Sequence, residues 1–68
     1  MVKTISIEGM HCEHCVKAVK DALAAVNGVD KVEVSLTNNN AVVEGVALEN
    51  AVLQEAIEDI GFDVVAIA

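Results

Sequence analysis

Hydrophobic and polar positions alternate in several stretches of the chain. Residues 2–8 place Ile5 and Ile7 on one face, and residues 29–36 place Val32, Val34 and Leu36 on one face, which predicts two half-buried strands. The polar stretch 37–40 predicts a turn, and residues 41–46 predict a third strand that forms a hairpin with the second. Residues 62–67 predict a short last strand.

Two other segments place apolar residues at intervals of three and four, which predicts amphipathic helices over residues 15–26 and 48–60. The apolar positions are Val16, Val19, Leu23 and Val26 in the first helix, and Leu48, Val52, Leu53, Ala56, Ile57 and Ile60 in the second. We expect the first helix to end at Asn27-Gly28 and the second at Gly61, because these residues tolerate a left-handed backbone.

The third strand has two faces of similar character. One face carries Ala41, Val43 and Gly45, and the other carries Val42, Glu44 and Val46. The pattern leaves open which face points inward, and Gly45 is a candidate for a β-bulge.

The predicted order is strand, helix, strand, strand, helix, strand. Each helix has one apolar stripe and each well-defined strand has one apolar face. A four-stranded antiparallel sheet with both helices on one face satisfies all of them, so we predict an α+β, ferredoxin-like sandwich. Because 68 residues leave room for one core, we expect residues 1–68 to form a single domain.

Composition and charge narrow the function classes. A hydrophobic content of 54% excludes a disordered chain, and the formal net charge of −7 argues against a nucleic-acid partner or an anionic membrane surface. All four lysines lie in residues 1–31 with four acidic residues, and the other seven acids lie in residues 32–68. No apolar run is long enough to insert into a membrane.

The first ten residues lack the cationic head and the apolar stretch of a signal peptide. We therefore expect a cytosolic protein, and in reducing conditions a structural disulfide between the two cysteines is disfavoured.

The cysteines lie in the segment Gly-Met-His-Cys-Glu-His-Cys of residues 9–15, where a loop leads into the first helix. Cys12 and Cys15 are three positions apart and can direct both sulfurs at one point. The helix dipole favours a thiolate at Cys15, and two thiolates form a soft site suited to Cu(I). Two incidental thiols, or a thioredoxin-type redox pair, are the alternatives; the redox pair usually accompanies a longer chain with a different element order.

The motif Gly-Met-x-Cys-x-x-Cys resembles that of the heavy-metal-associated domain family, which includes copper chaperones and modules of copper-transporting ATPases. It is matched by Gly9, Met10, Cys12 and Cys15. The resemblance extends to Asn27-Gly28-Val29 and Ile60-Gly61-Phe62. It implies a ferredoxin-like fold, a Cu(I) ion held by the thiolates of Cys12 and Cys15, and transfer of the ion to another Cys-x-x-Cys domain.

The resemblance also implies supporting roles at three positions. Met10 matches a residue that turns inward and braces the loop, and Gly9 matches a position that relieves crowding where the strand ends. Phe62 matches a position near the metal loop that is often Tyr in bacterial chaperones and Phe in ATPase modules; a core role for Phe62 is the alternative.

Two histidines accompany the cysteines. His11 departs from the family, which usually has Thr or Ser there, whereas His14 resembles the residue found in several bacterial chaperones. Both are candidate auxiliary ligands in a dimer or a transfer intermediate, or groups that tune the thiols, or simply solvated. Because adjacent His11 and Cys12 cannot easily converge on one ion, we rank zinc below copper.

The sequence therefore predicts a stand-alone cytosolic Cu(I) chaperone rather than an enzyme. It would deliver copper to the metal-binding domain of a copper-transporting P-type ATPase by thiolate exchange, with Lys17 and Lys20 as candidate docking residues. We expect a monomer without copper and a candidate copper-bridged dimer with it. The alternatives are a metal-binding module of such an ATPase, and a carrier or sensor of another soft metal (zinc, mercury or silver).

Overall fold

The elements follow one another as βαββαβ, which confirms the predicted order. In the computed structural model, which describes residues 1–68, they are β1 (Val2–Glu8), α1 (Glu13–Ala24), β2 (Val29–Ser35), β3 (Asn40–Gly45), α2 (Asn50–Glu58) and β4 (Asp63–Ile67). Both helices are shorter at their C-terminal ends than the apolar spacing predicts. Neither helix combines the length and the apolar character needed to cross a membrane.

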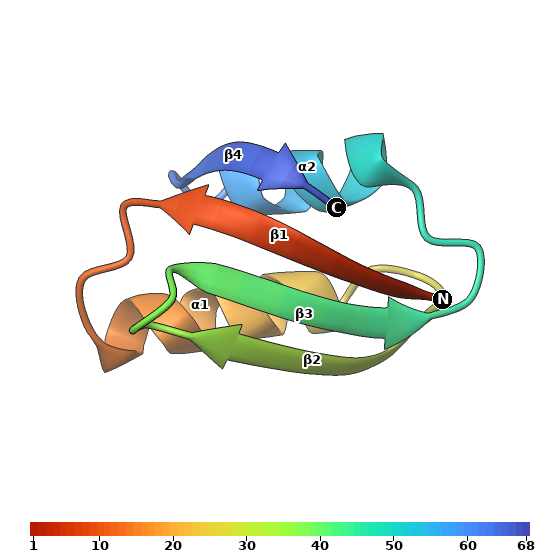
Figure 1. The fold of residues 1–68 in the computed structure, drawn as a ribbon, viewed down its shortest axis with the longest axis horizontal. Coiled ribbons are helices and arrows are strands. Elements are labelled where there is room, and N and C mark those ends of the chain that lie inside the picture. Colours follow the sequence, from red (N-terminus) through yellow and green to blue (C-terminus); the bar gives the residue numbers. More distant parts are fainter.

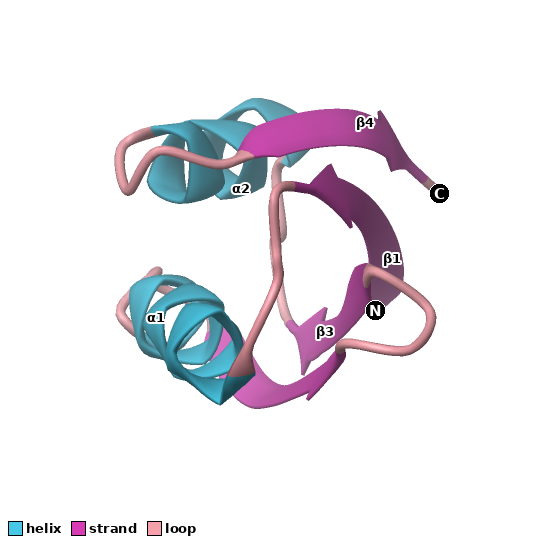
Figure 2. Cartoon of the chain, turned by 90° about the vertical axis from the view of Figure 1, so that its left-hand side faces the viewer, coloured by secondary structure: helices cyan, strands magenta, loops and turns pink.

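The four strands form one sheet in the order β2-β3-β1-β4, and all neighbours are antiparallel. Both helices cover the same face of this curved sheet (Figure 2). The arrangement confirms the ferredoxin-like sandwich. It places the β1–α1, β2–β3 and α2–β4 connections at one end of the molecule, on the left in Figure 1, and the N-terminus at the other.

The core is a thin aliphatic layer between the sheet and the helices. Its buried members are Ile5, Ile7, Met10, Val19, Leu23, Val32, Ala41, Val43, Leu48, Leu53 and Ile57. The burial of Ala41, Val43 and Gly45 shows which face of β3 points inward, a point that the sequence left open.

The apolar stripe of the second helix is narrower than predicted. Val52 is 44% exposed and Ile60 is 40% exposed, so neither joins the buried core. Ile60 lies beyond the last residue of α2, which ends at Glu58. Within the nine residues of α2, only Leu53 and Ile57 are buried against the sheet.

Two glycines meet at the end of the sheet where β2 and β3 pair. A Cβ atom on Gly45 would collide with the carbonyl oxygen of Gly28, and that oxygen accepts a hydrogen bond of 2.9 Å from the Val46 N–H. The ladder is irregular beside this contact, because Val29 pairs with Gly45 whereas Lys31 pairs with Glu44. The bulge expected near Gly45 therefore lies on β2, directly across from it.

We predict that Gly45→Ala lowers the free energy of unfolding by about 1–3 kcal/mol, because the added methyl group meets backbone that cannot move aside. Urea unfolding monitored by circular dichroism measures this change. Gly61→Ala is the control, since a Cβ there meets nothing within 4 Å and only the positive φ of 93° opposes it. A smaller loss for Gly45→Ala than for Gly61→Ala would contradict the steric explanation.

Candidate metal centre

The cysteine loop begins where β1 ends. Gly9 follows β1 with a φ of 104°, a left-handed conformation that residues with a side chain rarely adopt. The Phe62 ring lies against Gly9, and a Cβ there would come within 3.1 Å of the Phe62 Cδ1 atom. Met10 then turns into the core, where it is 4% exposed. Gly9 and Met10 thus fix the course of the chain just before the cysteines.

The end of α2 brings Phe62 to this position. The Gly61 N–H donates to the Glu58 carbonyl (3.0 Å), and the Phe62 N–H donates to the Ile57 carbonyl (3.4 Å). With Gly61 at a φ of 93°, this is the hydrogen-bond pattern of a Schellman cap, in which the residue after the glycine folds back onto the helix. Phe62 is half-buried and packs against the core.

The two cysteines sit at the start of α1. Cys12 is the residue before the helix, has extended backbone angles and is exposed. Cys15 lies in the first turn and is half-buried, and its N–H donates to the Cys12 carbonyl at 3.0 Å. Both cysteines are free, and their Sγ atoms are 3.7 Å apart. The first turn of α1 therefore directs both sulfurs at the same region of solvent.

The surroundings of Cys15 favour its thiolate form. The backbone N–H of His11 donates to the sulfur and lowers the pKa of Cys15, partial desolvation opposes this, and the thiol and N–H of Cys12 add to the lowering. The spacing of the cysteines predicts a thiolate at the helix start. The cysteine spacing does not predict that the His11 N–H lowers the pKa of Cys15. Every residue except proline has an N–H, and only the folded loop determines which one reaches the sulfur.

The two histidines are exposed and are not gathered with the sulfurs. Nowhere in the chain do three or more His, Cys, Asp or Glu side chains converge on a position that could hold a metal ion. The structure thus brings together Cys12 and Cys15 but adds neither His11 nor His14 to them.

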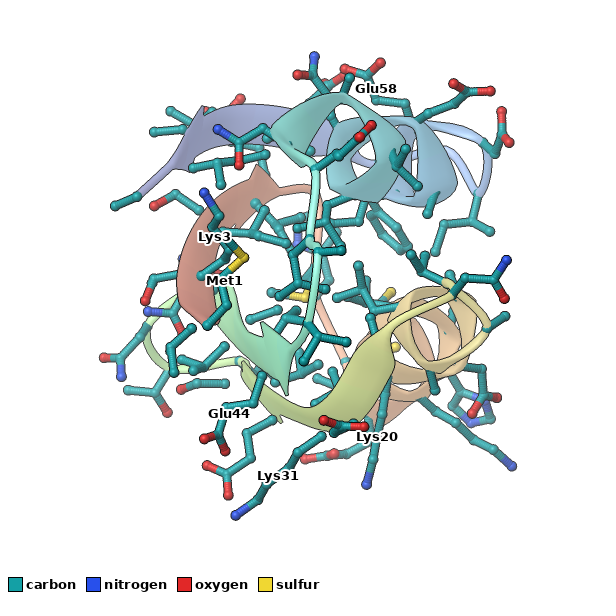
Figure 3. The ribbon with its side chains drawn as sticks, turned by 90° about the vertical axis from the view of Figure 1, so that its right-hand side faces the viewer. Met1, Lys3, Lys20, Lys31, Glu44 and Glu58 are labelled. Atoms are coloured by element: carbon teal, nitrogen blue, oxygen red, sulfur yellow. The ribbon has the colours of Figure 1, made fainter.

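Lys17 and Lys20 are exposed on α1 and form no ion pair. The one ion pair in the chain joins Lys31 and Glu33 at 3.6 Å, with both side chains largely in solvent. Lys20 and Lys31 lie on the side formed by α1 and β2, and Glu58 of α2 lies on the opposite side (Figure 3). α1 therefore presents two unpaired lysines, alongside Glu13 and Asp21, in a chain of net charge −7.

The sequence pattern of the heavy-metal-associated domain matches residues 4–63, which include both cysteines and Phe62. The chain belongs to this family. The resemblance noted from the Gly-Met-x-Cys-x-x-Cys motif is thereby confirmed over nearly the whole chain.

Relatives carry the same domain alone or within a larger protein. The copper chaperone CopZ of Staphylococcus epidermidis is 50% identical over 66 residues, which are 91% of this chain and 94% of the relative. Copper-transporting ATPase 1 of the rat is 44% identical over 62 residues, 88% of this chain but 4% of the ATPase. A solved structure of a CopZ metallochaperone superimposes with a TM-score of 0.90 at 36% identity, covering 96% of this chain and all of the other.

Chaperones of this kind carry metal rather than catalyse a reaction, in agreement with the expectation that the protein is not an enzyme.

We predict that Cys15 reacts with a thiolate-selective alkylating reagent at a lower pH in the folded protein than in the unfolded one. In the Cys12→Ser variant Cys15 is the only thiol, and the His11 N–H remains to hold its pKa down. Mass spectrometry of iodoacetamide labelling across a pH series, with and without urea, measures both midpoints.

The same pKa difference links stability to pH. Because the folded state lowers the pKa of Cys15, its contribution to stability is fully present above the unfolded pKa and is lost as the pH falls through the folded pKa. Identical labelling midpoints in the folded and unfolded chains would refute the effect.

Proposed function

We propose that the protein is a copper chaperone that carries one Cu(I) ion between Cys12 and Cys15. The observation that carries the proposal is the pair of thiols at the exposed start of α1, with Sγ atoms 3.7 Å apart, in a chain half identical to a named copper chaperone. Two thiolates form a soft donor set, which selects Cu(I) over hard cations, whereas structural zinc sites use four ligands.

The distance between the two Sγ atoms is shorter than a linear two-coordinate ion needs. With metal–sulfur bonds of about 2.3 Å, the length of a zinc–thiolate bond, a linear arrangement needs sulfurs about 4.6 Å apart, whereas 3.7 Å corresponds to a bent angle of about 107°. The pair therefore opens by about 0.9 Å to hold a two-coordinate ion. A two-coordinate ion leaves its sides open, and a third thiolate can bind there before either of the first two departs.

Gly9, Met10 and Phe62 are the proposed supports of this site. Met10 anchors the loop from within the core, and the Phe62 ring closes over Gly9 from the α2–β4 turn. Cys12, outside these anchors and exposed, is the thiolate that moves when the pair opens. Cys15, held in the first turn of α1, stays in place.

The acceptor we propose is the metal-binding domain of a copper-transporting P-type ATPase. The rat ATPase contains a segment 44% identical to this chain, so donor and acceptor can be two domains of one family with similar Cys-x-x-Cys loops. Exchange then proceeds through shared thiolates and never releases the ion to water. We place it in the cytosol, where reducing conditions keep both thiols available.

Lys17 and Lys20 are the proposed docking residues. Both are exposed on the helix that begins at the cysteines, and neither is neutralised by an acidic partner within the chain. Such charges steer a partner of opposite charge and orient it, and salt weakens the effect.

We predict that each chain binds one Cu(I). Cys12→Ser and Cys15→Ser should each weaken Cu(I) binding by far more than the roughly 10–100-fold caused by mutating residues that only surround metal ligands. Anaerobic titration of the reduced protein against a chelator measures this. His11→Ala and His14→Ala are the controls, and they stay within that range because the structure leaves both imidazoles away from the sulfurs. A preference for Zn(II) over Cu(I) in the same competition would overturn the copper assignment.

We also predict that Lys17→Glu with Lys20→Glu slows copper delivery to an ATPase metal-binding domain about tenfold at low ionic strength, and that high salt removes the difference. Stopped-flow transfer between the two proteins measures the rate. The matched control is Lys3→Glu, compared with Lys17→Glu alone, because each changes the net charge by the same amount and Lys3 lies on β1, outside α1. Equal slowing by these two single variants would show that overall charge, not docking, sets the rate.

A further inference from the structure

The turn between α1 and β2 carries an asparagine followed by a glycine. Asn27 and Gly28 are both exposed, and the connection from α1 to β2 lies at the end of the molecule opposite the β1–α1 loop (Figure 1). The turn's hydrogen bonds are donated by the N–H groups of Ala25, Val26 and Val29. The N–H of Gly28 donates none, so its nitrogen is not held by a hydrogen bond.

We propose that Asn27 is a site of spontaneous deamidation and isomerisation. The Gly28 nitrogen loses its proton to solvent base and attacks Cγ of Asn27, forming a C–N bond. The bond from Cγ to Nδ2 then breaks, and the side-chain nitrogen gains a proton and leaves as ammonia. Water then opens the succinimide. Attack at Cγ breaks the newly formed C–N bond and gives aspartate, whereas attack at the main-chain carbonyl carbon breaks the original peptide C–N bond and gives isoaspartate.

Glycine makes this attack possible at one asparagine in particular. Gly28 has no Cβ to block the approach of its nitrogen to the neighbouring side chain. The other four asparagines, Asn38, Asn39, Asn40 and Asn50, are each followed by a residue with a Cβ. The nitrogen that would attack Asn38 is also engaged, because the Asn39 N–H donates to the Leu36 carbonyl at 3.4 Å.

The isoaspartate product lengthens the backbone beside a tight backbone contact. One extra carbon would enter the chain directly before Gly28, whose carbonyl oxygen accepts the Val46 hydrogen bond and lies against Gly45. The new carboxylate also joins a groove that Asn27 shares with Glu49, close to the C-terminal end of α1. A negative charge is unfavourable beside the Glu49 carboxylate and also at the C-terminal end of a helix. The cysteines lie at the other end and keep their geometry.

Tryptic digestion isolates the site, because cleavage after Lys20 and Lys31 releases residues 21–31 with Asn27 as the only asparagine. The other four asparagines remain together in residues 32–68, which contain no lysine or arginine, and serve as the internal control. The intact protein is incubated in mildly alkaline buffer, and samples are digested and analysed by liquid chromatography and mass spectrometry.

The expected result is conversion of Asn27 several-fold faster than in the control peptide, with two products of equal mass that separate on the column. The Asn27→Gln variant should lose this conversion, since the longer side chain places its carbonyl out of reach of the same ring closure. Equal or slower conversion of Asn27 would overturn the proposal.

A second measurement separates backbone lengthening from charge. Asn27→Asp introduces the carboxylate without the extra backbone carbon. Aged wild-type protein, enriched in isoaspartate, should unfold at a lower urea concentration than Asn27→Asp, while its reaction with a thiol reagent stays unchanged. Identical unfolding midpoints would refute the structural consequence that we assign to the isomer.

Discussion

The contact between Phe62 and Gly9 determines how the cysteine loop is placed. It joins the end of α2 to the exit of β1, two segments about fifty residues apart in the sequence. The Schellman cap at Gly61 sets the direction of Phe62, and the left-handed backbone of Gly9 makes room for the ring. With Met10 buried beneath, the chain enters α1 at a fixed position, and the placement of Cys12 and Cys15 follows from it.

This anchoring explains how a thin aliphatic core supports a defined site. The loop contributes a single large side chain, Met10, to the buried cluster. Cys12 is exposed whereas Cys15 is half-buried against the core, so a change in their separation made by moving Cys12 disturbs little packed volume and costs little stability. A site held from one side and open on the other can exchange a ligand without unfolding the protein around it.

Much of the fold could be predicted from the sequence because alternation and helical spacing are local signals. The order of elements and the position of Cys15 in the first turn of α1 follow from such local signals, whereas the inward turn of Met10 is expected only from the resemblance to the family motif. The exposure of Val52 and Ile60 could not be predicted, because it depends on where α2 ends and how much of its surface the sheet covers. The meeting of Gly28 and Gly45 joins distant segments, and neither glycine alone indicates it.

Glycine contacts at the two ends of the molecule have different roles. At one end, Gly28 and Gly45 allow backbone to touch backbone, and this contact closes the β2–β3 pair with no side chain between them. At the other end, Gly9 accepts an aromatic ring, and the contact holds a loop that must stay accessible. Because the first contact carries no ligand and the second carries little of the core, the contact that closes the sheet is separate from the contact that positions the thiols.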